Sequence, residues 1–167
     1  MTAAGLIGVM AKAGWTVATC ESVTGGLIAA ALTDVAGASE VVRGGLVTYA
    51  TDLKSRLAGV DPGLIAAHGV VSGEVATAMA AGASEACGAD WAVAVTGVAG
   101  PGAAEGCPAG TVWLAITGPG VSETALLRLA GDRADVRRQV VTAALDRLET
   151  LARAAVLHHD PGSRAVD

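Results

Sequence analysis

Ser22 is the residue whose surroundings in the sequence best suit nucleophilic chemistry. Residues 15–18 before it have strand composition, and residues 27–32 after it are rich in alanine and leucine, which favour helix. A strand that ends in small polar residues at a helix start leaves backbone N–H groups facing outward, where they favour an anion or a developing anion. We therefore expect the N–H groups near Gly25 and Gly26 to serve as oxyanion donors.

Lysine is the residue type best placed to accept the proton of Ser22. The three histidines, which could form a Ser-His-Asp triad, occur at no suitable strand end; they are His68, His158 and His159. Lys54 stands one turn into a helix that follows Tyr49 at the end of a second strand, whereas Lys12 falls on the N-terminal helix. In a partly dry pocket a lysine has a lowered pKa and can deprotonate a serine, with a tyrosine orienting or relaying the proton.

Several familiar catalytic motifs are excluded by spacing. Ser22 lacks the flanking glycines of a hydrolase nucleophile elbow and the lysine three residues on of a penicillin-binding site. No Gly-x-Gly-x-x-Gly follows the first strand, and no Walker loop ends in Gly-Lys. The structural alternative is that Ser22 and Thr24 are helix caps, Tyr49 is a packing residue and Lys54 is a solvated charge. The spacing alone leaves both interpretations open.

The composition predicts one domain, which we place at residues 1–157, followed by a poorly ordered tail at 158–167. The hydrophobic fraction of 52% and a mean hydropathy of +0.53 suggest a membrane protein at first. However, no uninterrupted apolar segment reaches spanning length, and no basic region precedes an apolar run at the N-terminus. We therefore expect a cytoplasmic protein with no membrane partner.

Charge and cysteine content narrow the class of ligand. A net charge of −5 with only two lysines argues against a nucleic-acid partner, so we expect a small molecule. The cysteines, Cys20, Cys87 and Cys107, are odd in number and form no C-x-x-C pair. This pattern argues against a disulfide framework and a zinc site and fits a reducing compartment, with the three thiols acting as buried small hydrophobes.

The order of expected elements predicts an α/β fold. We expect helices at 3–13, 24–33, 51–57, 64–68, 72–86 and 132–157, and strands at 15–22, 46–49, 91–95, 110–116 and 122–129. Gly14 should end the first helix, Thr51 or Asp52 should cap the third, Ser72 the fifth, and Asp132 with Asp135 the last. Residues 103–108 should form a mobile excursion. Gly118-Pro119-Gly120 marks a hairpin, so the last two strands should be antiparallel. Helices that alternate with strands early and a hairpin late predict a single three-layer α/β/α domain with a mixed β-sheet. In such sheets ligands bind outside the strand ends.

Six segments in a fixed order carry a resemblance to a known family. They read ESVTGG (21–26), TYATDLK (48–54), HGVVS (68–72), TGVAGP (96–101), PAGTVW (108–113) and GDRADVR (131–137). Over residues 3–155 the chain resembles the CinA C-terminal domain family, the nicotinamide-nucleotide amidohydrolases. The resemblance implies hydrolysis of the carboxamide of nicotinamide mononucleotide to nicotinate mononucleotide and ammonia, in pyridine nucleotide salvage, with no metal and no cofactor. It also implies a homodimer or larger assembly and a form without the N-terminal molybdopterin-binding-like domain of fused members.

The same resemblance implies roles for particular residues. Ser22 would be the nucleophile of a Ser-Tyr-Lys arrangement with Tyr49 and Lys54. The residues implied in substrate binding lie beside these or on the 96–101 loop and the last helix; they are Glu21, Thr24, Gly25, Gly26, Thr96, Gly97, Gly100, Arg133 and Arg137. An arginine at the start of a helix grips a phosphate bidentately, although such arginines also occur as a solvated face.

The chain departs from the family pattern at three places. Val23 stands where a cysteine is usual after the serine, so that thiol is not required here. Ala50 and Thr51 replace a usual Ser-Asn pair, and residues 102–107 lack the usual acidic and lysine-bearing sequence. Two alternatives follow: a nucleotide-binding or regulatory module without catalysis, and an amidase for a different amide.

Overall fold

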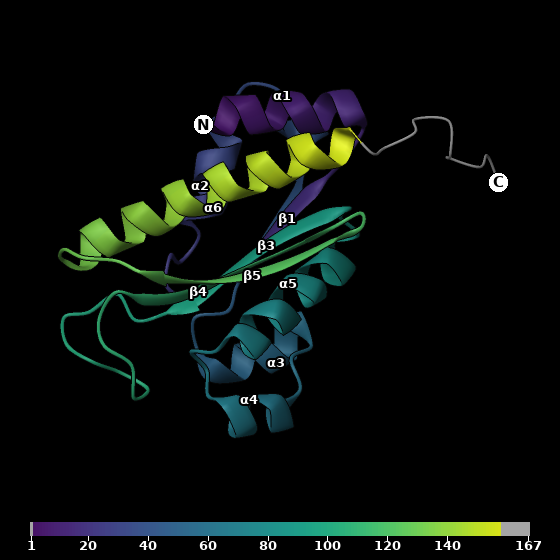
Figure 1. Cartoon of the computed structure of the whole chain (residues 1–167). Coiled ribbons are helices and arrows are strands. Elements are labelled where there is room, and N and C mark those ends of the chain that lie inside the picture. Colours follow the sequence, from purple (N-terminus) through teal and green to yellow (C-terminus); the bar gives the residue numbers. More distant parts are fainter. Residues whose placement is uncertain (1, 158–167) are drawn as a thin grey trace.

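A five-stranded mixed sheet forms the centre of the protein in the computed structural model, which describes residues 2–157 (Figure 1). The elements, in chain order, are α1 (Ala3–Ala13), β1 (Val17–Glu21), α2 (Leu27–Thr33), the 3-10 helix η1 (Ala38–Glu40), β2 (Val42–Val47), α3 (Thr51–Ala58), α4 (Pro62–His68), α5 (Gly73–Cys87), β3 (Trp91–Gly97), β4 (Thr111–Gly118), β5 (Val121–Arg128) and α6 (Arg133–Val156).

The strand order β2-β1-β3-β4-β5 confirms the predicted mixed sheet. β1 pairs in parallel with both β2 and β3, while β3, β4 and β5 pair in antiparallel fashion, which confirms the late hairpin. The carboxyl ends of β1, β2 and β3 therefore meet at one edge of the sheet. Because β5 also ends at this edge, α6 begins there and brings its first turn toward the three strand ends.

Helices cover both faces of the sheet, as predicted. α1, α2 and α6 lie on one face, and α3, α4 and α5 lie on the other (Figure 1). β3 shows why the two faces differ: Trp91, Val93 and Val95 pack on the first face, and Ala92 and Ala94 on the second. Alternate side chains of a strand point to opposite faces of the sheet. The large residues of β3 therefore fill the space beneath α1, α2 and α6, and its alanines let α5 approach the other face closely.

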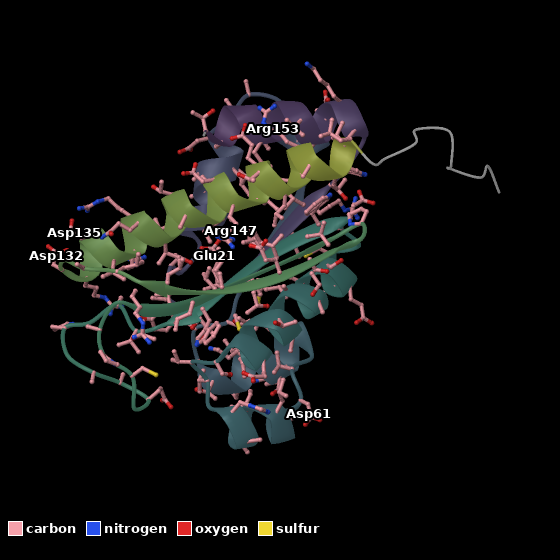
Figure 2. All side chains as sticks on the ribbon, viewed as in Figure 1. Glu21, Asp61, Asp132, Asp135, Arg147 and Arg153 are labelled. Carbon is pink, nitrogen blue, oxygen red and sulfur yellow. The ribbon has the colours of Figure 1, made fainter. Side chains whose placement is uncertain are left out.

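Helix boundaries set by local capping agree with the sequence. α1 ends at Gly14, which has a left-handed φ of 66°, and the hydroxyl of Ser72 accepts a hydrogen bond at the start of α5. Asp132 and Asp135 form a capping box at the start of α6, where Figure 2 shows the two side chains together.

Three boundaries near the sheet edge differ from the prediction. α2 begins at Leu27 instead of Thr24, because Gly25 and Gly26 take left-handed φ values of 62° and 102° in the turn before it. Gly45 lies inside β2 instead of leading into it; a Cβ there would be 2.3 Å from Thr19 Oγ1 on β1. α3 has Ala50 at its N-cap, so neither Thr51 nor Asp52 caps it.

Other expectations have mixed outcomes. The predicted tail at 158–167 lies outside the described residues. The three cysteines are free, but only Cys20 is buried, whereas Cys87 and Cys107 are partly exposed. In the part of the chain described by the structure, no helix has both the length and the apolar character needed to cross a membrane.

Candidate active site

Ser22 and Lys54 are in direct contact at the edge where the parallel strands end. The Ser22 amide, just after β1, donates a hydrogen bond to the carbonyl of Val95 on β3 at 3.0 Å and so anchors the turn. Lys54 lies in the first turn of α3, and its Nζ is 3.1 Å from Ser22 Oγ and 2.8 Å from the carbonyl oxygen of Thr48. Lys54 is 1% exposed and Ser22 9% exposed, so this contact is nearly dry.

Burial lowers the pKa of Lys54 below its usual 10.5, because a desolvated ammonium loses its hydration. Negative charge on Cys20 or Glu105 would oppose this shift. The pKa of Cys20 is itself raised to about 11, mainly by burial, so at neutral pH this residue is an uncharged thiol and the opposition comes from Glu105. A neutral Lys54 has one lone pair, which can accept the Ser22 proton while an N–H still donates to Thr48.

The backbone donors at the Ser22 turn differ from those predicted. The Gly25 N–H donates to the Ser22 carbonyl at 3.1 Å, and the Gly26 N–H donates to the Glu21 carboxylate at 3.0 Å. Both groups are therefore occupied within the protein. The N–H groups of Val23 and Thr24 have no acceptor among the described residues, and Val23 lines the cavity beside Ser22. Of these two residues Val23 alone lines the cavity, so the oxyanion donor that the turn offers lies two residues before Gly25.

Glu21 lies inside the protein and caps α2. Its carboxylate accepts hydrogen bonds from the Thr24 hydroxyl at 2.6 Å and from three backbone N–H groups, those of Gly26, Ile28 and Ala29, at 2.8–3.0 Å. Glu21 and Thr24 are 0% exposed, and neither lines the cavity. A carboxylate at a helix N-terminus is stabilised by these donors and by the helix dipole. Its role in the described structure is to hold the Ser22 turn rigid.

Arg137 also lies outside the cavity and supports the same turn from α6. Its guanidinium donates to the carbonyl of Thr24 at 2.8 Å, across 113 residues of sequence, and a Cβ on Gly25 would be 3.6 Å from it. The buried Arg137 Nε has no hydrogen-bond partner among the described residues. The structure therefore connects Thr24, Gly25 and Arg137 to one another and brings none of them to the cavity wall.

Tyr49 and Arg133 meet at the protein surface. Arg133 donates to the Tyr49 hydroxyl at 2.7 Å and to the carbonyl oxygen of Gly100 at 2.9 Å, so it joins the β2–α3 corner to the β3–β4 loop. Tyr49 is 57% exposed. Within the described residues its hydroxyl makes no hydrogen bond with Ser22 or Lys54, so the expected Ser-Tyr-Lys arrangement is present as a Ser-Lys pair with the tyrosine bound to arginine.

All of these segments border one cavity of about 320 Å³. The predicted site residues that line it are Ser22, Tyr49, Lys54, Thr96, Gly97, Gly100 and Arg133, and those that do not are Glu21, Thr24, Gly25, Gly26 and Arg137. The volume falls within the range of about 300–1,000 Å³ typical of small-molecule sites. The cavity therefore has room for a ligand at Ser22.

Thr96 and Gly97 hold the far wall of the cavity. The Thr96 hydroxyl donates to the carbonyl of Val70 at 2.9 Å, which connects β3 to the segment before α5. A Cβ on Gly97 would lie 2.6 Å from the carbonyl oxygen of Thr111 and 2.7 Å from Val112, so only glycine lets β3 pair with β4 here. Both residues therefore shape this wall of the cavity.

Sequence reasoning missed two polar residues of the lining, Thr51 and Glu105. The sequence predicts Thr51 only as a helix cap, and Glu105 lies in the segment 103–108, which is expected to be a mobile excursion. Its composition gave no signal, because a single glutamate in a Gly- and Ala-rich loop is usually a solvated charge. Among the described residues, no group of three or more His, Cys, Asp or Glu is placed to hold a metal ion.

Comparison with known proteins identifies the family. Residues 2–152 match the model of the CinA C-terminal domain, and the chain belongs to this family. It is 48% identical over 141 residues to a CinA-like protein of Frankia casuarinae, covering 84% of this chain and 33% of that protein. It is 50% identical over 145 residues to a CinA-like protein of Mycolicibacterium paratuberculosis, covering 83% and 33%. The chain thus spans about a third of the length of these relatives.

Solved structures of the family share the fold along nearly their whole length. A competence-damaged protein (CinA) superfamily protein from Klebsiella pneumoniae 700603 has a TM-score of 0.88 and 35% identity, covering 91% of this chain and 96% of that chain. The competence/damage inducible protein CihA of Agrobacterium tumefaciens has a TM-score of 0.86 and 40% identity, covering 89% and 92%.

Proposed function

We propose that this protein hydrolyses the carboxamide of nicotinamide mononucleotide, yielding nicotinate mononucleotide and ammonia through an acyl-serine intermediate. The observation that carries the proposal is the 3.1 Å contact between Ser22 Oγ and the buried Lys54 amine. Family membership supports the substrate class, because the family resembled by the sequence includes nicotinamide-nucleotide amidohydrolases.

In the first half-reaction neutral Lys54 accepts the hydroxyl proton of Ser22 while Oγ attacks the amide carbon. Negative charge then develops on the amide oxygen, which the free N–H group of Val23, a residue of the cavity lining, is suited to stabilise. The Lys54 ammonium returns the proton to the amide nitrogen, so the C–N bond breaks and ammonia leaves. Its hydrogen bond to the Thr48 carbonyl keeps Lys54 in place during this exchange.

In the second half-reaction a water molecule takes the place of ammonia. Lys54 accepts a proton from this water as its oxygen attacks the acyl carbon, and the same proton returns to Ser22 Oγ when the ester bond breaks. The net change is one water consumed, one carboxylate formed and one ammonium ion released, because the proton of the new carboxylic acid passes to ammonia.

Arg133 supplies the group suited to the phosphate of the nucleotide. Its guanidinium lines the cavity and is held by two neutral acceptors, the Tyr49 hydroxyl and the Gly100 carbonyl. A phosphate competes well with such partners, because charge-assisted bidentate hydrogen bonds are stronger than neutral ones.

The test is to incubate the purified protein with nicotinamide mononucleotide and to measure ammonia and nicotinate mononucleotide. Ser22→Ala should lower kcat by a factor on the order of 10³ or more, because it removes the nucleophile. Ser39→Ala is the matched control, since Ser39 is exposed on η1 and away from the cavity. Absence of product with wild type, or full activity of Ser22→Ala, would contradict the proposal.

A substrate panel separates the two alternatives. Tight binding of the nucleotide by calorimetry without any product indicates a binding or regulatory module. Release of ammonia from another amide, but not from the nucleotide, indicates an amidase of different specificity.

A further inference from the structure

The charges that line the cavity are unevenly distributed. Of the described lining residues, Lys54 and Arg133 carry basic side chains and Glu105 alone carries an acidic one. Glu21 immediately precedes Ser22 in the sequence, but its carboxylate is buried away from the cavity and accepts hydrogen bonds from four donors. Glu105 is therefore the lining residue of the described chain that can attract a positive charge on a ligand.

Glu105 stands at the tip of a small hairpin in the β3–β4 loop, which extends outward from the sheet in Figure 1. Ala104 and Cys107 exchange two backbone hydrogen bonds of 2.9 and 3.0 Å, and Glu105 and Gly106 between them have φ values of 53° and 71°. Such a turn favours Asn, Asp or Gly at its first position. A glutamate there is unusual, and backbone strain of this kind clusters at ligand sites.

The Glu105 carboxylate is available to a ligand. It makes no hydrogen bond or ion pair with any other residue in the described part of the chain. Its charge nevertheless acts on the reacting centre, because it raises the pKa of Lys54 against the effect of burial. Ser22 Oγ lies 3.1 Å from Lys54 Nζ, so an amide bound at Ser22 would also lie within the electric field of the Glu105 carboxylate.

We propose that the Glu105 carboxylate makes this site selective for amides borne on a cationic ring over neutral amides. This inference rests on the proposed function and names the charge of its substrate class. In nicotinamide mononucleotide the ring nitrogen that carries the ribose is a pyridinium cation, close to the carbon that carries the carboxamide. Arg133 repels such a ring, as does Lys54 whenever it is protonated, and Glu105 offsets that repulsion.

The test compares two nucleotides of nearly the same shape. Reduced nicotinamide mononucleotide keeps the ribose, phosphate and carboxamide but has an uncharged dihydropyridine ring. Glu105→Gln should lower kcat/KM for the cationic nucleotide about fivefold, the effect of losing an exposed charge pair, and should change kcat/KM for the reduced one less than about twofold. The ratio of the two changes cancels the different reactivities of the amides.

Salt provides an independent readout. Raising the ionic strength from about 0.01 M to about 1 M shortens the screening length from about 30 Å to about 3 Å. The preference of wild type for the cationic nucleotide should therefore shrink as salt rises. Glu105→Gln should show little of this salt dependence.

Two control variants separate charge from loop structure. Glu105→Asp keeps the charge and suits the left-handed backbone, so it should retain most of the preference. Glu85→Gln makes the same change in net charge at an exposed residue of α5 outside the cavity, and it should leave both nucleotides unaffected.

A binding arm separates failure of this inference from failure of the proposed function. In the Ser22→Ala background, calorimetry should show tighter binding of the cationic nucleotide than of the reduced one, with the difference reduced by Glu105→Gln. This preference without hydrolysis by wild type would support the inference and contradict the proposed function. Hydrolysis with equal losses for both nucleotides in Glu105→Gln would overturn the inference alone, and absence of binding to either nucleotide would overturn both.

Discussion

Ser22 and Lys54 meet inside the protein, whereas Tyr49 and Arg133 meet at its surface, although all four residues line one cavity. Lys54 is 1% exposed and Tyr49 57%. The buried amine has a lowered pKa and is held by the Thr48 carbonyl. The surface guanidinium, by contrast, remains charged and has neutral partners that a ligand can displace.

This difference separates two tasks within one site. Proton transfer needs an amine that spends part of its time neutral and stays within reach of the hydroxyl, which burial provides. Recognition of a charged nucleotide needs a permanent cation that water can reach, so that the ligand can bind and leave. The predictions below test whether the two pairs divide the work in this way.

Replacing Lys54 by Met should have the largest effect. Met keeps most of the volume but cannot accept the Ser22 proton, so kcat should fall about 10²- to 10⁴-fold, as measured by steady-state ammonia release. Lys12→Met is the matched control, because Lys12 is the other lysine of the chain and is exposed on α1. A Lys54→Met enzyme with near wild-type kcat would remove the lysine from the mechanism.

Replacing Arg133 by Met should weaken binding more than chemistry. Loss of charge-assisted hydrogen bonds worth about 1.5–3 kcal/mol should raise KM for the nucleotide about 13- to 160-fold, with a smaller change in kcat. Arg138→Met is the comparison, because Arg138 is exposed one turn further along α6 and pairs with Asp135. If kcat fell as far as in Lys54→Met while KM stayed constant, the proposed division between the two pairs would be wrong.

Replacing Tyr49 by Phe should have a modest effect. The hydroxyl contacts Arg133, and losing one such hydrogen bond is worth about 0.5–1.5 kcal/mol, which corresponds to about 2- to 12-fold in kcat/KM. Measuring kcat and KM separately tests this prediction. A large loss confined to kcat would instead show that the hydroxyl reaches Ser22 or Lys54 when substrate is bound.

The smallest effect concerns the pH dependence of stability. The folded-state pKa of Lys54 is lowered, so between that pKa and about 10.4 the unfolded chain binds more protons than the folded one. The free energy of unfolding contributed by Lys54 therefore rises with pH across this window, and below the window its destabilising effect is complete. Urea titrations at a series of pH values give the free energy of unfolding of wild type and of Lys54→Met. Across this window it should rise more steeply with pH for wild type, and an identical pH dependence for the two proteins would mean that Lys54 has an ordinary pKa.

The same pKa predicts the acid side of the rate profile. Activity needs neutral Lys54 and should fall as pH drops below its pKa. Since the chain has only two lysines, NMR of lysines labelled at Cε can follow Lys54 directly, with Lys12→Met to assign the signals. Agreement between the two titrations would identify Lys54 as the group that controls the rate.

Local signals in the sequence were enough to predict most elements of the fold. Gly14 ends α1, Ser72 begins α5, and Asp132 with Asp135 begins α6, because a cap depends on residues only a few positions apart. The apolar run of β3 and the Gly-Pro-Gly turn likewise predicted a buried strand and a hairpin. The α/β class and the mixed sheet followed from the order of these elements.

The sequence also pointed to Ser22 at the mouth of a helix and, because no histidine and no other lysine is suitably placed, to Lys54 as its base. Only the tertiary structure decided which groups touch: Lys54 meets Ser22 across 32 residues, Arg133 meets Tyr49 across 84, and Arg137 meets Thr24 across 113. It also turned Glu21 inward to cap α2 and placed Glu105 on the cavity wall. Contacts of this kind depend on how strands pair and helices pack, which no local pattern of residues encodes.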